Sequence, residues 1–191
     1  MKLIAHDGTT FDPTNPHTLD YSPHYISRAL SRIHRWQGNS TMPISVARHS
    51  LIVSHIVPPW LRLPALLHDA HEAYTGFGDV AAPMKPADLI FLEMNIDIHI
   101  ADVYGFDFRL FNHPKLRRAD IAARAAELRQ LFPRTPHTKR LAAELDPAHS
   151  YTCPIPNHDH ERDRLDMLTS LQQYVPTTPS VPADATTTPD H

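Results

Sequence analysis

The stretch LLHDAHEAYTGFGD, residues 66–79, places a histidine and an aspartate side by side at the end of an apolar run. Glu72 follows three residues after Asp69, and two glycines come shortly before Asp79. An adjacent imidazole and carboxylate are either ligands of a metal ion or the polar edge of a core helix. A lone His-Asp pair arises often by chance, so the rest of the chain decides between these interpretations.

Composition narrows the class of protein. A chain of 191 residues can form one domain with a hydrophobic core. The net charge of −3 gives no reason to expect nucleic acid or an anionic membrane as a partner. The single cysteine, Cys153, excludes an intramolecular disulfide and favours a reducing, cytoplasmic location. No apolar run is long enough to span a membrane, and the 15 histidines favour metal or proton chemistry.

The apolar residues recur at helical spacing and no segment alternates with the period of a strand, so we expect an all-α helical bundle. Ser22 with Pro23, and Ser45, are typical helix starts, whereas Gly105 is a typical end. The expected helices begin at Pro23 and cover about 45–57, 60–74, 87–104, 114–132, 138–145 and 159–173. Residues 1–173 form the expected domain, and the Pro- and Thr-rich residues 174–191 an expected disordered tail.

Candidate metal ligands fall on three expected helices: His49, His68 with Asp69, and Asp120. Two imidazoles and two carboxylates suit Mn, Fe, Co, Ni or Zn and leave positions open for water and substrate. Each residue also has a simpler explanation. An inward histidine such as His49 is often a hydrogen-bonded core residue, and Asp120 alone is typical of a solvated helix face. Their joint occurrence favours the metal site.

Further polar residues surround these ligands. Glu72 lies four residues after His68, where it can orient a metal-bound water or simply be a surface carboxylate. Asp79 is either a second acid-base group or ordinary turn chemistry after glycine.

Cationic and aromatic residues complete the list of candidates. Arg35, Arg48 and Lys85 are candidate phosphate contacts. Trp36 offers a flat apolar face for a base.

With these residues in place, the chain resembles the HD-domain metal-dependent phosphohydrolases from about Ser22 to Phe132. The nearest branch is a small phage and bacterial one that includes 5′-deoxynucleotidases and phage dATP triphosphohydrolases. IHRWQGNSTMPISVARHS aligns without a gap with a family pattern like ICRFGGHT..PYSVAEHS. ALLHDAHEAY matches the signature ALLHDAAEAY, and RRADIAARAAE matches a late helix like KEADRRLLATE.

The resemblance implies a role for each matched residue. His49, His68, Asp69 and Asp120 would hold one divalent transition metal. Glu72 would be the catalytic acid, with Asp79 as a second candidate catalytic residue. Arg35, Trp36 and Lys85 would contact the substrate, and Glu127 would accompany Asp120. The family also allows a second divalent ion that arrives with the substrate.

The chain departs from the family pattern near the substrate. The segment TGFGD carries two extra residues before Asp79, Arg48 replaces a glutamate, and Asn39 replaces a histidine. The metal shell is intact, whereas the base preference does not carry over.

The resemblance implies hydrolysis of a 2′-deoxynucleotide at the α-phosphate, and we expect a triphosphohydrolase. A 5′-deoxynucleotidase acting on monophosphates is the alternative, and a nucleotide sensor on a decayed HD scaffold is the second one. Relatives form homo-oligomers, so we expect a homo-oligomer. The apolar helix at 87–104 could form the interface or pack in the core.

Overall fold

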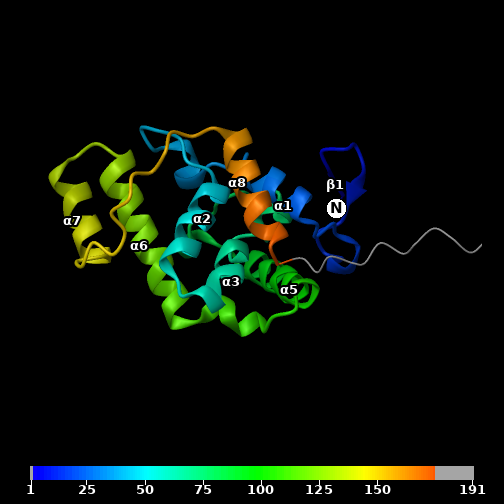
Figure 1. Cartoon of the computed structure of the whole chain (residues 1–191). Coiled ribbons are helices and arrows are strands. Elements are labelled where there is room, and N and C mark those ends of the chain that lie inside the picture. The colour runs from blue at the N-terminus through cyan, green and yellow to red at the C-terminus, as the bar shows by residue number, and fades with distance from the viewer. Residues whose placement is uncertain (1, 175–191) are drawn as a thin grey trace, which may run out of the picture.

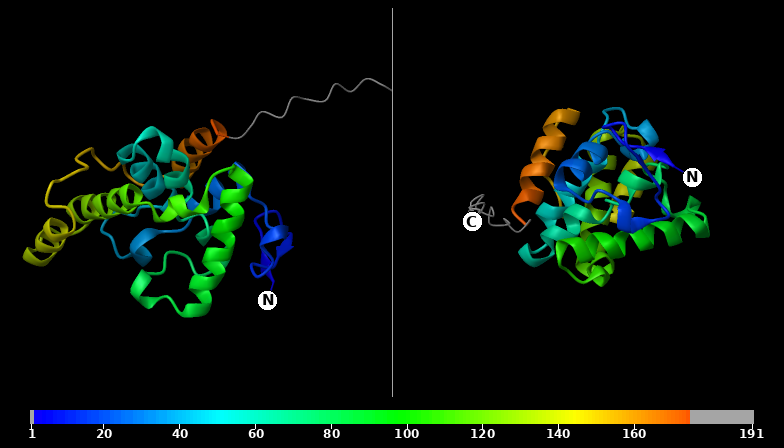
Figure 2. Two further views of the ribbon diagram at one scale, coloured as in Figure 1. Left: turned by 90° about the horizontal axis from the view of Figure 1, so that it is seen from below. Right: turned by 90° about the vertical axis from the view of Figure 1, so that its right-hand side faces the viewer.

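The computed structural model describes residues 2–174, and within them it confirms the predicted all-α architecture. A short antiparallel hairpin of β1 (Leu3–Ile4) and β2 (Thr10–Phe11) lies at the edge of the helical body (Figure 2). The helices are α1 (Pro23–Leu30), α2 (Val46–Ile56), α3 (Arg62–Leu67), α4 (Glu72–Thr75), α5 (Ala87–Tyr104), α6 (Pro114–Leu131), α7 (Pro136–Leu145) and α8 (His160–Gln172). The predicted disordered tail lies, apart from Tyr174, outside the described residues.

Local signals in the sequence set the ends of the helices as predicted. Ser22 Oγ accepts a hydrogen bond from the first turn of α1, and Pro23 occupies the first helical position. Ser45 Oγ does the same for α2. At the end of α5, Gly105 has a φ of +72°, where a residue with a Cβ atom is strained. The start of α2 fixes which of its faces turns inward.

The prediction of a single helix over residues 60–74 is wrong. The segment divides into a 3-10 turn (Pro59–Leu61), α3 and α4, with a tight turn between the two helices. His68 Nδ1 lies 2.8 Å from the carbonyl oxygen of Ala65. A continued α-helix would offer that oxygen to the N–H of residue 69, so the ring competes with the helical hydrogen bond.

The turn after α3 is wound more tightly than an α-helix. The Glu72 N–H donates to the Asp69 carbonyl at 3.1 Å, and the Tyr74 N–H donates to the His71 carbonyl at 3.0 Å. Such bonds over three residues place Asp69 and Glu72 on the same side of the chain. The sequence predicted instead that Glu72 shares a face with His68.

Helix α2 is central to the body and packs against α3, α6, α8 and α1 (Figure 1). Its buried residues enter two hydrophobic clusters. Ala47 and Leu51 join the cluster that includes residues of α1, α3, α4, α5 and α8, whereas Ile52 and Val53 join the cluster that includes residues of α3 and α6. Because both sides of α2 are packed, the side chains on its inward face have fixed positions.

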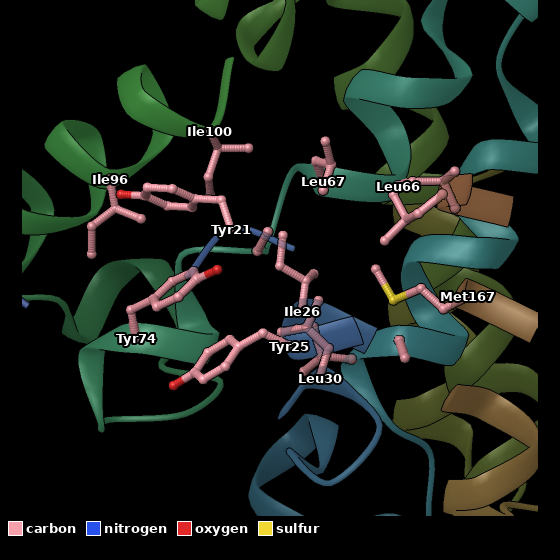
Figure 3. Close-up of a cluster of buried hydrophobic side chains, with 14 of the residues drawn as sticks. Tyr21, Tyr25, Ile26, Leu30, Leu66, Leu67, Tyr74, Ile96, Ile100 and Met167 are labelled. Carbon is pink, nitrogen blue, oxygen red and sulfur yellow. The ribbon is translucent and has the colours of Figure 1, made fainter. Parts of the chain in front are cut away.

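Aromatic rings anchor α4 to the N-terminal part of the chain (Figure 3). The rings of Tyr25 and Tyr74 stack at 5.3 Å with an interplanar angle of 8°. The Tyr74 hydroxyl also donates to the carbonyl oxygen of Asp20 at 2.8 Å. These contacts hold the short α4, and with it Glu72, against α1.

One face of helix α5 packs in the core, which was one of the two roles predicted for this helix. Leu89, Ile96 and Ile100 are buried, whereas Ile90 and Phe91 remain exposed. Within residues 2–174, no helix combines the length and the apolar character that crossing a lipid bilayer requires. The homo-oligomer stays a prediction.

Leu67 immediately precedes the His-Asp pair and is fully buried. We expect Leu67→Ala to lower the free energy of unfolding by about 2–5 kcal/mol, because it leaves a cavity in the core. Urea denaturation measures this change. Leu165→Ala on α8, where the side chain is 47% exposed, is the matched control. An equal loss in both variants would contradict the packing described.

Candidate metal centre

His49 lies at the centre of the candidate site, on the inward face of α2. Its side chain is fully buried, and Nδ1 lies 2.6 Å from Glu127 Oε1. Nε2 lies 3.0 Å from Asp120 Oδ1 and 3.8 Å from Asp69 Oδ2. A carboxylate that holds Nδ1 orients the ring and directs Nε2 at the position of a ligand. His49 is therefore oriented as the histidine ligand of a metal is.

His68 approaches the same point from the turn after α3. The Ala65 carbonyl engages Nδ1, and Nε2 lies 3.2 Å from Asp69 Oδ2. The Nε2 atoms of His49 and His68 are both buried and lie 3.0 Å and 3.2 Å from carboxylate oxygens of Asp120 and Asp69, but neither contact has the geometry of a hydrogen bond. A buried nitrogen without a partner is costly unless a ligand satisfies it. The two orphaned atoms thus fit a bound cation.

The structure brings the four predicted ligands together from three segments. Donor atoms of His49, His68 and Asp69 all lie within 4.8 Å of one another, and Asp120 of α6 joins them through its 3.0 Å contact with His49. The pKa of Asp120 is lowered, because burial raises it but the close contact with His49 and the charge of that ring outweigh burial. The donor set of two imidazoles and two carboxylates fits a divalent transition metal. That these residues bind one stays a prediction.

Glu127 connects the metal ligands to the rest of the site. Its carboxylate is fully buried on α6. Oε1 contacts His49, while Oε2 accepts from Trp36 Nε1 at 2.7 Å and from Arg35 Nε at 3.3 Å. Burial raises the pKa of Glu127, but the Arg35 charge and these hydrogen bonds outweigh it and lower the pKa overall.

Arg35 and Trp36 occupy a strained turn before α2. Trp36 has a φ of +56° and Gln37 a φ of +52°, a left-handed conformation that is costly outside glycine. Trp36 is held at both ends, since its indole N–H donates to Glu127 and its backbone N–H donates to Asp79 Oδ2 at 2.9 Å. The indole is thus a structural anchor as well as a wall of the cavity.

The longer TGFGD loop still returns Asp79 to the site. Gly76 and Gly78 have φ values of +75° and +66°, so the chain turns back where other residues would be strained. Asp79 Oδ1 lies 3.7 Å from Arg35 Nη1, and Oδ2 accepts from Trp36. The two extra residues therefore lengthen the loop without displacing this carboxylate.

Glu72 is buried next to Asp69, and its Oε2 atom has no hydrogen-bond partner among the described residues. Burial is the largest cause that raises its pKa, and the charge of Asp69 adds to it. A carboxyl group in this environment retains its proton to higher pH and can donate it. The alternative of a surface carboxylate is excluded for Glu72.

Lys85 lines the cavity, but its ammonium group lies 2.7 Å from Glu93 Oε2 of α5. Glu93 also lies 3.7 Å from His71 Nε2, and His71 Nδ1 lies 3.0 Å from Asp97 Oδ1. His71, Glu93 and Asp97 were not predicted from the sequence. The available signal was a glutamate at a core-facing position between Leu89 and Ile96 of an apolar helix.

A second set of donor atoms adjoins the first. Ligand atoms of Asp69, His71 and Glu72 also lie within 4.8 Å of one another. The two sets share Asp69, so Asp69, His71 and Glu72 are an alternative set of ligands to those predicted from the sequence.

Arg48 does not contact the site, which contradicts its prediction as a phosphate contact. Its guanidinium binds Asp163 at 2.8 Å and Asp166 at 2.6 Å on α8. Asp163 is buried and also accepts from Ser45 Oγ at 2.6 Å. The buried carboxylate requires a counter-charge, and Arg48 supplies it away from the cavity.

A cavity of about 410 Å³ opens beside the predicted metal ligands. Its lining includes Arg35, Trp36, Lys85, Arg124 and Phe132, together with the carboxylates of Asp69, Glu72, Asp79 and Asp120. This size and this mixture of flat apolar walls and charged groups are typical of a site for a small polar molecule.

Replacing the buried carboxylate that orients His49 tests the metal centre. We expect Glu127→Gln to weaken Mn²⁺ binding about 10–100-fold, because the ring loses the group that fixes its orientation. Isothermal titration calorimetry measures the affinity. Glu144→Gln on the exposed face of α7 is the control and should bind like the wild type. Unchanged affinity in Glu127→Gln would count against His49 as a ligand.

Metal binding should also depend on pH. Burial lowers the pKa of His49, but the charge of Glu127 and the close contacts with Asp120 and Glu127 outweigh burial and raise it to about 9. An ion must displace the proton, so the Mn²⁺ affinity should rise with pH and level off near the pKa. Titrations between about pH 6 and 8.5 check this trend. A pH-independent affinity would contradict it.

Comparison with known proteins identifies a curated relative and states no function for it. No family model matches the chain. A curated relative, the Uncharacterized protein YfdR of Escherichia coli (strain K12), is 36% identical over 108 residues. The match covers 56% of this chain and 58% of the relative, so the chain spans less than two thirds of that protein's length. The name of the relative states no activity.

Proposed function

We propose that the chain is a metal-dependent phosphohydrolase that cleaves 2′-deoxynucleotides at the α-phosphorus. The observation that carries the proposal is the pair of buried, unpartnered Nε2 atoms of His49 and His68, which face the carboxylates of Asp69 and Asp120. These donors lie beside a cavity lined by arginine, lysine and tryptophan. The class of substrate comes from the resemblance to the HD-domain phosphohydrolases.

His49, His68, Asp69 and Asp120 would hold the ion. When bound, a divalent ion lowers the pKa of a coordinated water and neutralises phosphoryl oxygens. The protein fixes the ligands beforehand, since Glu127 and the Ala65 carbonyl hold the two rings through their Nδ1 atoms.

Arg35 would stabilise the negative charge of the phosphate. Its guanidinium is buried and lies 3.3 Å from Glu127, 3.5 Å from Asp69 and 3.7 Å from Asp79. These carboxylates fix its position, so little reorganisation is needed when a phosphate arrives. Arg124 and Lys85, which line the same cavity, are placed to contact further phosphate oxygens.

Glu72 would act as the general acid. Its raised pKa keeps a proton available, and its unpartnered Oε2 can donate that proton to the leaving oxygen. Asp79 is already engaged with Trp36 and Arg35, which suits it to a positioning role.

The two candidate reactions differ in the length of the phosphate chain on the nucleotide substrate. Arg124 supports a triphosphate, since it supplies positive charge in addition to Arg35, whereas the charge of Lys85 is paired with Glu93. Arg48 is paired with Asp163 and Asp166, so its charge is not available to a longer phosphate chain. This pairing favours a monophosphate and hence a 5′-deoxynucleotidase. We keep the triphosphohydrolase as the first proposal.

The test incubates the full chain and Mn²⁺ or Co²⁺ with each deoxynucleoside monophosphate and triphosphate, and identifies the phosphate species released. Inorganic triphosphate supports the first proposal, and orthophosphate from a monophosphate supports the second. We expect Glu72→Gln to lower kcat by about 10²–10⁴-fold, because it cannot donate a proton.

The controls separate an enzyme from a nucleotide sensor. Asp69→Asn should abolish turnover, whereas the exposed Glu144→Gln should leave it unchanged. Nucleotide binding without turnover in the wild type would contradict the enzymatic proposal and support a sensor on an HD scaffold.

A further inference from the structure

A second cavity, of about 430 Å³, lies between the N-terminal hairpin, α1 and α4. Glu72 is the one residue that lines both this cavity and the metal-centre cavity. Neither the predicted ligands nor the predicted substrate contacts use the second space. Its size falls in the range of cavities that bind small molecules.

One wall of the second cavity is aromatic and rigid. Phe11 meets Tyr25 edge-on at 6.3 Å, and the His6 ring lies 5.8 Å from Tyr25. Tyr25 in turn stacks on Tyr74, which is fixed in the hydrophobic core (Figure 3). Aromatic side chains held in this way offer a flat surface to a planar ring.

Positive charge in the second cavity comes from α1 and the residues after it. Arg28 and Arg32 both line the cavity, and Arg32 Nη1 donates to the Arg28 carbonyl oxygen at 3.2 Å. Within residues 2–174, no carboxylate oxygen lies within 4.0 Å of either guanidinium. The nearby Glu161 is paired with Arg164 instead. Glu72 is the only carboxylate among the lining residues, so the cavity favours an anion.

We propose that this second cavity is a nucleotide-binding site, separate from the metal centre. The base would lie against Phe11 and Tyr25, and the phosphates would bind Arg28 and Arg32. Arginine pairs well with phosphate oxygens, and a nucleoside triphosphate joins a planar ring to several such oxygens. A ligand in this site contacts Glu72 from a cavity that the reaction does not occupy.

Removing divalent ions separates the two sites experimentally. Without an ion, the carboxylates of Asp69, Asp79 and Asp120 repel an anion from the metal-centre cavity. We therefore expect the full chain to retain one dATP-binding site in EDTA, measured by isothermal titration calorimetry. Binding measured on the chain as purified gives the comparison.

Charge reversal at the two arginines tests the location. Arg28→Glu with Arg32→Glu should weaken the EDTA-resistant binding of dATP by roughly 100-fold, the loss of two charge-assisted contacts. The matched control reverses Arg62 and Arg117, which are exposed and line neither cavity. Ala29→Leu fills the space while keeping both arginines, and should also weaken binding.

Three results would overturn the proposal: no EDTA-resistant binding of dATP, binding that survives Arg28→Glu with Arg32→Glu, or inorganic triphosphate binding as tightly as dATP. The last result would show an anion site without a place for the base. The readout is binding, so the outcome is independent of whether the metal centre hydrolyses nucleotides.

Discussion

The candidate site depends on one buried carboxylate. Glu127 is fully buried on α6 and contacts the His49 ring on α2, together with the guanidinium of Arg35 and the indole of Trp36 in the turn before α2. An unpaired carboxylate at this depth would be strongly destabilising, so these partners are required. The same contacts fix the orientation of a predicted metal ligand and of a predicted phosphate contact. Stability of the fold and geometry of the site are therefore coupled through Glu127.

The strained turn at Trp36 follows from the same constraint. Its left-handed backbone allows the indole N–H to reach Glu127 while the backbone N–H reaches Asp79. The glycines of the TGFGD loop allow Asp79 to return to this position despite the longer loop. The turn at Trp36 and the TGFGD loop thus meet at the cavity, where the backbone N–H of Trp36 donates to Asp79.

Much of the fold and part of the site could be predicted from the sequence, because those signals are local. Ser45 as a cap fixes the start of α2, and apolar spacing then turns His49 inward. Contacts between distant residues could not be predicted. Lys85 pairs with Glu93, and Arg48 pairs with Asp163, which lies 115 residues further along the chain.

The break in the helix at 60–74 has a different origin. The His68 ring contacts the Ala65 carbonyl where α3 ends, and there it competes with the hydrogen bond that would continue the α-helix. Helical periodicity carries no information on such a contact. The turn shapes the candidate site, because it places Asp69 and Glu72 on one side.

Locating the ion is the most direct test of the central claim. Anomalous diffraction from crystals of the full chain soaked in Mn²⁺ shows where a metal binds. We predict one peak within bonding distance of His49 Nε2, His68 Nε2 and the carboxylates of Asp69 and Asp120. No peak, or a peak bound by Asp69, His71 and Glu72 alone, would contradict it.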